Sequence, residues 1–116
     1  MTITMPDRAE HCSVTALPAA ELERLVHAAE RPCVAPGADP DDWFPAEPGS
    51  GYQPRARACY ESRALALCRG CPVELECLEL ALVREGPVRG HGISGGTTPW
   101  QRQAIKASRG WAVRRG

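Results

Sequence analysis

Three cysteines near the middle of the chain have a spacing that suits metal binding. Cys68, Cys71 and Cys77 follow the pattern C-x2-C-x5-C. Two thiols separated by two residues can reach one metal centre when a tight turn points both sulfurs the same way. The third thiol lies within about two helical turns of the second, ~9 Å of axial rise. A fourth ligand would close the site, and Cys33 is the best placed candidate.

Four thiolates can bind either a zinc ion or an iron–sulfur cluster. The spacing matches neither the paired C-x2-C units of structural zinc nor the compact run of bacterial ferredoxins, so the residues alone leave both open. A thiol–disulfide catalyst is a third possibility, although it would use a βαβ setting that this sequence does not predict. Because no Ser/His/Asp set, paired-carboxylate site or nucleotide motif is evident, we expect a protein that is not an enzyme.

The other two cysteines are predicted to have no ligand role. Cys12 lies in an N-terminal stretch without periodicity, and we interpret it as a spare thiol. Cys59 precedes Cys68 by about two and a half helical turns, so the two side chains should point to opposite faces. We expect Cys59 to be buried as a small hydrophobe.

The composition limits both the core and the cellular setting. The 116 residues include six cysteines, 11 prolines and 11 glycines but few aromatic residues, so we expect a small domain that needs a staple. No apolar signal region follows Met1, and no stretch approaches the ~20 apolar residues of a membrane span. We therefore expect a cytoplasmic protein without a membrane partner, in which clustered cysteines bind metal rather than form disulfides.

Several segments have the residue pattern of short helices. They cover 18–30, 55–68, 72–85 and 98–109. In the second of these segments, Ala58, Leu65 and Ala66 are expected to face inward. The pattern predicts a small all-α domain of about four short helices around the metal centre.

The chain is expected to have three parts. These are a flexible N-terminus at 1–16, a metal-binding domain at 17–97 and a basic C-terminal helix and tail at 98–116. A glycine-rich segment at 90–96 precedes the last helix. Because glycine adopts positive φ without strain, this segment predicts a tight turn or a short hairpin.

Charge is distributed unevenly along the chain. Residues 84–116 carry seven Lys/Arg and one acidic residue, whereas residues 1–83 carry seven Lys/Arg and thirteen acidic residues. The last helix has a basic stripe opposite an apolar stripe, and we predict that the basic stripe faces outward and contacts DNA phosphates. The alternative is a basic segment that folds back on the acidic half. The predicted DNA-contacting residues are Arg102, Lys106, Arg109, Arg114 and Arg115.

An aromatic pair interrupts a loop rich in Pro, Gly and Asp. Trp43 and Phe44 are followed by Pro45. Either both rings cap the small core, or they form a partner-binding anchor, since exposed aromatic residues mark binding hot spots.

These motifs together resemble the WhiB-like family of iron–sulfur transcription regulators from actinobacteria and their phages. The resemblance covers roughly residues 31–110. It is carried by the lone Cys33, the Asp39-Pro40 and Trp43-Phe44-Pro45 stretch, the Cys68-x2-Cys71-Pro72 and Cys77 run, the Gly92-Ile93-Ser94-Gly95-Gly96 turn and the basic C-terminal helix.

The resemblance implies a small helical domain around a 4Fe–4S cluster ligated by Cys33, Cys68, Cys71 and Cys77. It implies a transcriptional regulator that responds to oxygen or nitric oxide and binds promoter DNA through its basic tail. It also implies binding to the C-terminal domain of the primary sigma factor of RNA polymerase. Some family members have been described as disulfide reductases in the cluster-free form.

The sigma-binding residues implied by the resemblance belong to the aromatic stretch and the glycine-rich turn. They are Trp43, Phe44, Pro45, Ile93, Ser94, Gly95 and Gly96. This sequence departs from the family pattern at Ser94, where the family turn normally has Trp. The missing indole would remove an apolar contact worth about 3 kcal/mol if it were fully buried.

Overall fold

The structure is a computed structural model that describes residues 14–47 and 54–114. The main elements are helical, and the prediction of an all-α fold is confirmed. They are α2 (Ala19–Ala28), η1 (Pro32–Val34), η2 (Pro40–Trp43), α3 (Pro54–Cys68), α4 (Glu74–Glu85) and α5 (Pro99–Ser108). No helix in the described part of the chain is long and apolar enough to cross a membrane.

The first residues of helices α4 and α5 are determined by local hydrogen bonds. At α5, the Thr98 hydroxyl accepts a hydrogen bond from Gln101 N at 3.3 Å, and Gln101 Oε1 accepts one from Thr98 N at 2.9 Å. This capping box, with Pro99 in the first turn, matches the predicted helix start. Helix α4 begins at Glu74, whereas the sequence predicted a start at Pro72. The difference arises because the chain first makes a turn in which Cys71 N donates a hydrogen bond to Cys68 O at 3.1 Å.

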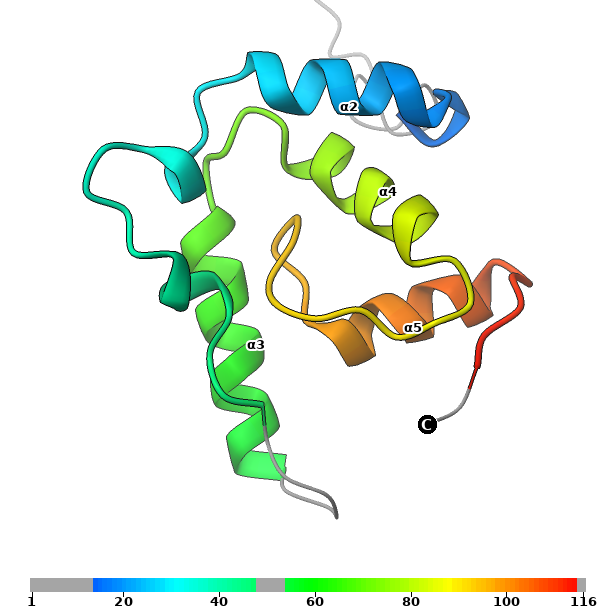
Figure 1. Cartoon of the computed structure of the whole chain (residues 1–116). Helices are drawn as coiled ribbons and strands as arrows, with labels where there is room; N and C mark the ends of the chain where they lie inside the picture. Colours follow the sequence, from blue (N-terminus) through cyan, green and yellow to red (C-terminus); the bar gives the residue numbers. More distant parts are fainter. Residues whose placement is uncertain (1–13, 48–53, 115–116) are drawn as a thin grey trace, which may run out of the picture.

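Two apolar clusters form the core. The first, here called the α2–α4 cluster, joins those two helices, which lie along each other in Figure 1. It consists of Val14, Leu22, Val26, Val73 and Leu80. The second, the aromatic cluster, joins η2, α3 and the glycine-rich segment. It consists of Trp43, Tyr60, Ala64, Cys68 and Ile93.

Helix α3 uses a different inward face from the predicted one. Ala58, Leu65 and Ala66 are exposed, and the face that packs on the core carries Tyr60 and Ala64. The reason is aromatic packing: the Tyr60 ring meets Trp100 of α5 edge-on, with ring centroids 5.0 Å apart. This contact sets the rotation of α3 about its axis.

The glycine-rich segment forms the predicted tight hairpin turn. Ser94 and Thr97 exchange backbone hydrogen bonds at 3.2 and 3.0 Å, and Gly95 and Gly96 between them both have positive φ. Two central residues with positive φ are the mark of a type I′ turn. Just before the turn, Ile93 N donates to Trp43 O at 2.7 Å, which holds the hairpin against the loop that carries the aromatic pair.

Candidate metal centre

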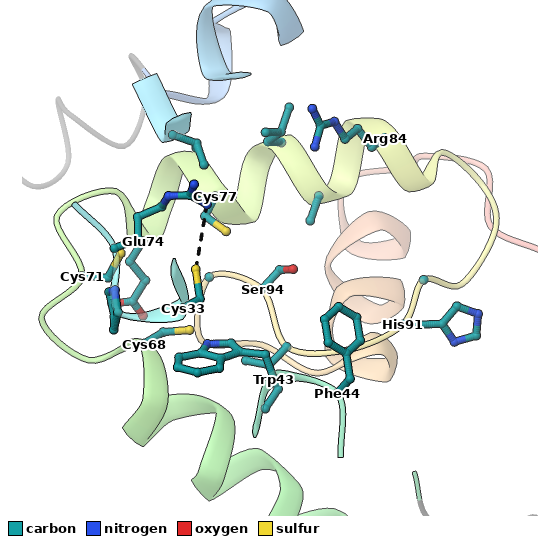
Figure 2. Close-up of a pocket in the computed structure, with 18 of the residues that line it drawn as sticks. Cys33, Trp43, Phe44, Cys68, Cys71, Glu74, Cys77, Arg84, His91 and Ser94 are labelled. Atoms are coloured by element: carbon teal, nitrogen blue, oxygen red, sulfur yellow. Dashed lines mark hydrogen bonds between the residues drawn. The ribbon is translucent and has the colours of Figure 1, made fainter. Parts of the chain in front are cut away.

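One cavity of about 420 Å³ contains all four cysteines that the sequence singled out. Cys33 comes from η1, Cys68 from the last position of α3, Cys71 from the turn that follows, and Cys77 from the first half of α4. Figure 2 shows their sulfur atoms around the same space, with the hairpin and Trp43 below it. The fold therefore brings together thiols separated by up to 44 positions in the sequence.

The cavity lies at the seam between the two apolar clusters. Cys71 and Cys77 pack against the α2–α4 cluster. Cys68 is a member of the aromatic cluster, and Cys33 packs against it. Each cluster thus contributes two of the four thiols, and a group bound by all four would connect the two halves of the core.

Burial raises the pKa of the Cys68 thiol, while hydrogen bonds from the Gly96 backbone and the Trp43 side chain act in the opposite direction. Burial likewise raises the pKa of Cys77, and the Gly95 backbone opposes that rise. Gly95 and Gly96 of the hairpin therefore lie beside two of the sulfurs. The sequence assigned Gly95 and Gly96 to a tight turn and to a partner surface and missed their place beside the thiols, which positive φ in a Gly-Gly turn could have signalled.

Gly95 and Gly96 of the hairpin lie so close to α4 that a side chain at either position would collide with it. A Cβ added to Gly95 would lie 2.5 Å from Leu78 Cβ and 2.7 Å from Glu74 O. A Cβ on Gly96 would lie 2.6 Å from the Glu74 carboxylate. The turn is therefore pressed against the start of α4, which holds Gly95 and Gly96 beside the Cys77 and Cys68 thiols.

The donor set fits a metal group made for thiolates. Four sulfurs are the ligands of both structural zinc and iron–sulfur clusters. Among residues 14–47 and 54–114, no three His, Cys, Asp or Glu side chains are gathered closely enough to hold a single metal ion. The four thiols instead line the walls of a cavity of about 420 Å³.

Comparison with known proteins identifies the family of this chain. Residues 28–105, more than half of the chain, match the family described as "Transcription factor WhiB". The chain belongs to the WhiB family. It is also similar to the transcriptional regulator WhiB7 of Mycolicibacterium smegmatis (strain ATCC 700084 / mc(2)155), with 41% identity over 58 residues.

The matched region covers 50% of this chain and 44% of the WhiB7 relative, so the chain spans less than half the length of that relative. No solved structure matches this chain. The WhiB family assignment confirms the resemblance inferred from the motifs, and membership of a transcription-factor family agrees with the expectation of a role other than catalysis.

The basic stripe of α5 faces inward in this WhiB-family chain, so the prediction that it faces outward is wrong for Arg102 and Lys106. Both residues are 0% exposed. Arg102 Nε donates to one oxygen of Glu85 at 2.8 Å, and Lys106 Nζ lies 3.0 Å from the other oxygen. The Glu85 carboxylate, at the end of α4, is the counter-charge for both cations, and its attraction offsets the free-energy cost of burying them. DNA phosphates outside the domain cannot reach either residue.

Arg109 also pairs with a carboxylate of the fold. Its guanidinium makes two parallel hydrogen bonds to the buried Glu79, at 2.8 and 2.7 Å, and this pairing raises the pKa of Arg109. Among the predicted DNA-contacting residues, Arg114 is exposed and Arg115 lies outside the described residues. The alternative interpretation, in which the basic segment folds back on the acidic half, is confirmed for Arg109.

Two further cations of the basic segment also pair with the acidic half. Arg84 lies 2.7 Å from Glu23 of α2, and Arg89 contacts Glu47. With Arg109, three cations of the basic segment therefore pair with carboxylates of the acidic half.

The two residues of the aromatic pair differ: one ring caps the core, and the other is exposed as a partner-binding anchor would be. Trp43 is buried in the aromatic cluster and caps the core, whereas Phe44 is 62% exposed. Ile93 and Gly95 of the hairpin are buried too. Pro45, Ser94 and Gly96 are half-buried. Of the residues assigned to a partner surface, Phe44 is thus the side chain that presents the largest exposed apolar area.

The two cysteines without a predicted ligand role lie away from the cavity or outside the description. Cys59 is exposed on α3, so the prediction that it is buried is wrong. Its opposition to the buried Cys68 follows from the helical spacing and is confirmed. Burial fails because the α3 face that carries Cys59 lies opposite the aromatic cluster. Cys12 lies outside the described residues.

Proposed function

We propose that this chain is a cytoplasmic transcriptional regulator that holds a 4Fe–4S cluster with Cys33, Cys68, Cys71 and Cys77 and responds to oxidation or nitric oxide. The observation that carries the proposal is the convergence of the four thiols on one cavity of about 420 Å³. The family match over residues 28–105 supports the regulatory role. Zinc is the competing occupant, since it uses the same ligands.

When bound, an iron–sulfur cluster supplies one-electron chemistry and a centre that oxidants can attack. The residues of this chain supply the rest. The four thiols would hold the group, Gly95 and Gly96 lie beside two of the ligand sulfurs, and Trp43 closes the cavity on the side of the aromatic cluster. Loss of the group would release four thiols and uncouple the two halves of the core, because ligand binding energy is folding energy.

Two kinds of partner belong to the proposal. The primary sigma factor C-terminal domain would contact Phe44, whose exposed ring lies beside the hairpin: a Cβ on Gly92 would meet it at 2.5 Å. Exposed aromatic side chains are common binding anchors. DNA phosphates would be reached from the end of the chain, at Arg114 and Arg115, because the α5 cations are occupied within the fold.

The test is the metal content and visible spectrum of the full chain purified without oxygen. We expect a brown protein with about four irons per chain, whose absorbance bleaches on titration with nitric oxide or oxygen. A colourless protein with one zinc per chain would contradict the cluster and leave a zinc-stapled interaction domain.

Matched cysteine variants sharpen this test. Cys68→Ala removes a buried thiol of the cavity, and Cys59→Ala removes an exposed thiol from the same helix. We expect Cys68→Ala to lose the iron and Cys59→Ala to keep it. Full iron content and absorbance in Cys68→Ala would show that the cavity is not where the cluster binds.

A further inference from the structure

Arg31 points its positive charge at a proposed ligand sulfur instead of at a carboxylate. Its Nη1 donates to Cys33 Sγ at 3.9 Å, the dashed contact drawn in Figure 2. The side chain is half-buried in the wall of the thiol cavity. Its Nε is buried and has no hydrogen-bond partner among the described residues. Because a buried donor without an acceptor is costly, the guanidinium beside Cys33 has hydrogen-bonding capacity that the described residues do not satisfy.

The other shielded arginines of the structure behave differently. Arg89, Arg102 and Arg109 are also half-buried or buried, and each pairs with a glutamate. Within residues 14–47 and 54–114, Arg31 is the shielded arginine whose charge no ion pair neutralises. Its charge therefore acts on whatever the thiols bind.

A carboxylate faces the same cavity near other ligands. Glu74 lines the cavity at the start of α4, and in the described part of the chain it has no ion-pair partner. The position of a Cβ on Gly96 would be 2.6 Å from its Oε2 and 3.8 Å from Cys68 Cβ, so the carboxylate lies close to Cys68. Arg31 and Glu74 are thus opposite charges beside different ligands of one cavity, and they do not neutralise each other by a direct ion pair.

We propose that Arg31 and Glu74 set the reduction potential of the bound cluster, in opposite directions. This inference rests on the proposed function. Adding one electron to the cluster forms and breaks no bond and moves no proton, but it makes the cluster and its thiolates more negative by one charge. A cation at Cys33 favours that state, and a carboxylate at Cys68 disfavours it. Net charge and hydrogen bonds to sulfur are known to set cluster potentials, and shielding from water strengthens both effects.

The experiment compares Arg31→Leu and Glu74→Gln in the full chain loaded without oxygen. Iron content is measured first, and the midpoint potential is then found by mediated redox titration with dithionite as the one-electron donor. At the wild-type midpoint, we expect the ratio of reduced to oxidised cluster to fall about tenfold in Arg31→Leu, a shift of about 59 mV downward for a one-electron couple. Glu74→Gln should raise the ratio and shift the midpoint upward.

Two controls separate charge from structure. Arg24→Leu removes an exposed arginine of α2 that pairs with Glu21 and should leave the midpoint unchanged. Arg31→Lys keeps the charge and loses the planar guanidinium, so it should retain most of the wild-type potential. If Arg31→Leu fails to load iron, Glu74→Gln decides: an upward shift of its midpoint supports the inference, and an unchanged midpoint overturns it.

The outcomes distinguish the two proposals. A wild-type chain that binds no iron overturns the proposed function and this inference with it. A loaded cluster whose midpoint is the same in Arg31→Leu and Glu74→Gln, or moves in the same direction in both, overturns this inference alone. Midpoints displaced in opposite directions, with Arg24→Leu unchanged, support it.

Discussion

Replacing Arg102 by alanine should markedly lower the free energy of unfolding, because this arginine is a buried side chain that connects several elements and not a surface cation. Its side chain is fully buried and donates to the Glu85 carboxylate. It also donates to the backbone oxygens of Thr97 at 2.8 Å, His91 at 3.2 Å and Gly92 at 2.8 Å. One guanidinium thus connects the end of α4 and the backbone on both sides of the hairpin turn to α5.

The expected loss of unfolding free energy is about 3 kcal/mol. Removing one partner of a buried ion pair typically costs about 3–5 kcal/mol. Here Lys106 still lies 3.0 Å from Glu85, so the carboxylate is not left without a counter-charge, and the lower end of that range applies. Most of the cost comes instead from three carbonyl groups that lose their donor and from the space vacated by the side chain. Such a loss is a large share of a typical domain stability of roughly 5–15 kcal/mol.

The assay is urea unfolding of the full chain followed by far-UV circular dichroism, at matched iron content. Arg114→Ala, which removes an exposed arginine of the same segment, is the control and should unfold at the wild-type urea concentration. Arg102→Lys should fall between the two, because lysine restores the charge but not the fork of donors. An Arg102→Ala protein with wild-type stability and weakened DNA binding would refute the reasoning and restore the outward-facing stripe.

Two further substitutions test the hairpin and the exposed ring. Gly95→Ala places a Cβ at 2.5 Å from Leu78 Cβ and at a φ of +55°, so we expect a loss of at least about 1–3 kcal/mol in the same urea assay. Gly37→Ala has a φ of +84° but open space, and an equal loss in both variants would show that close packing of the hairpin is unimportant. Phe44→Ala should abolish capture of the purified sigma factor C-terminal domain without changing the urea midpoint, since the ring is 62% exposed. Leu65→Ala, which alters another exposed apolar residue, should leave capture intact, and unchanged capture by Phe44→Ala would exclude Phe44 as the anchor.

Sequence reasoning located the helices and the cysteine set because both depend on local signals. The capping box and Pro99 mark the start of α5 within the sequence itself. The C-x2-C spacing similarly places two thiols on one turn without knowledge of the rest of the fold. What could not be predicted was how Cys33 approaches the other three thiols, since η1 and α3 are joined by a long loop rich in Pro and Gly.

The inward face of a helix was harder to predict than its existence. In α5 the basic and apolar stripes have the same helical period, so the pattern gives two faces and does not say which one is buried. The deciding residue is Glu85, which lies 17 positions before Arg102 and belongs to another helix. A half-buried carboxylate that can pair with two cations reverses the usual assignment, and no local pattern in α5 indicates its presence.

The placement of the four thiols connects the proposed chemistry to the stability of the fold. Cys71 and Cys77 pack on the α2–α4 cluster, and Cys33 and Cys68 pack on the aromatic cluster. A group ligated by all four is therefore a covalent bridge across the seam between two small cores, neither of which has much apolar area of its own. Release of that group would weaken the contact between α4 and the hairpin, and the hairpin is bonded through Ile93 to the backbone of Trp43, next to Phe44. A change at the thiols that moved the hairpin would therefore reach the exposed ring through one backbone hydrogen bond of 2.7 Å, and this is the path that we propose for the switch.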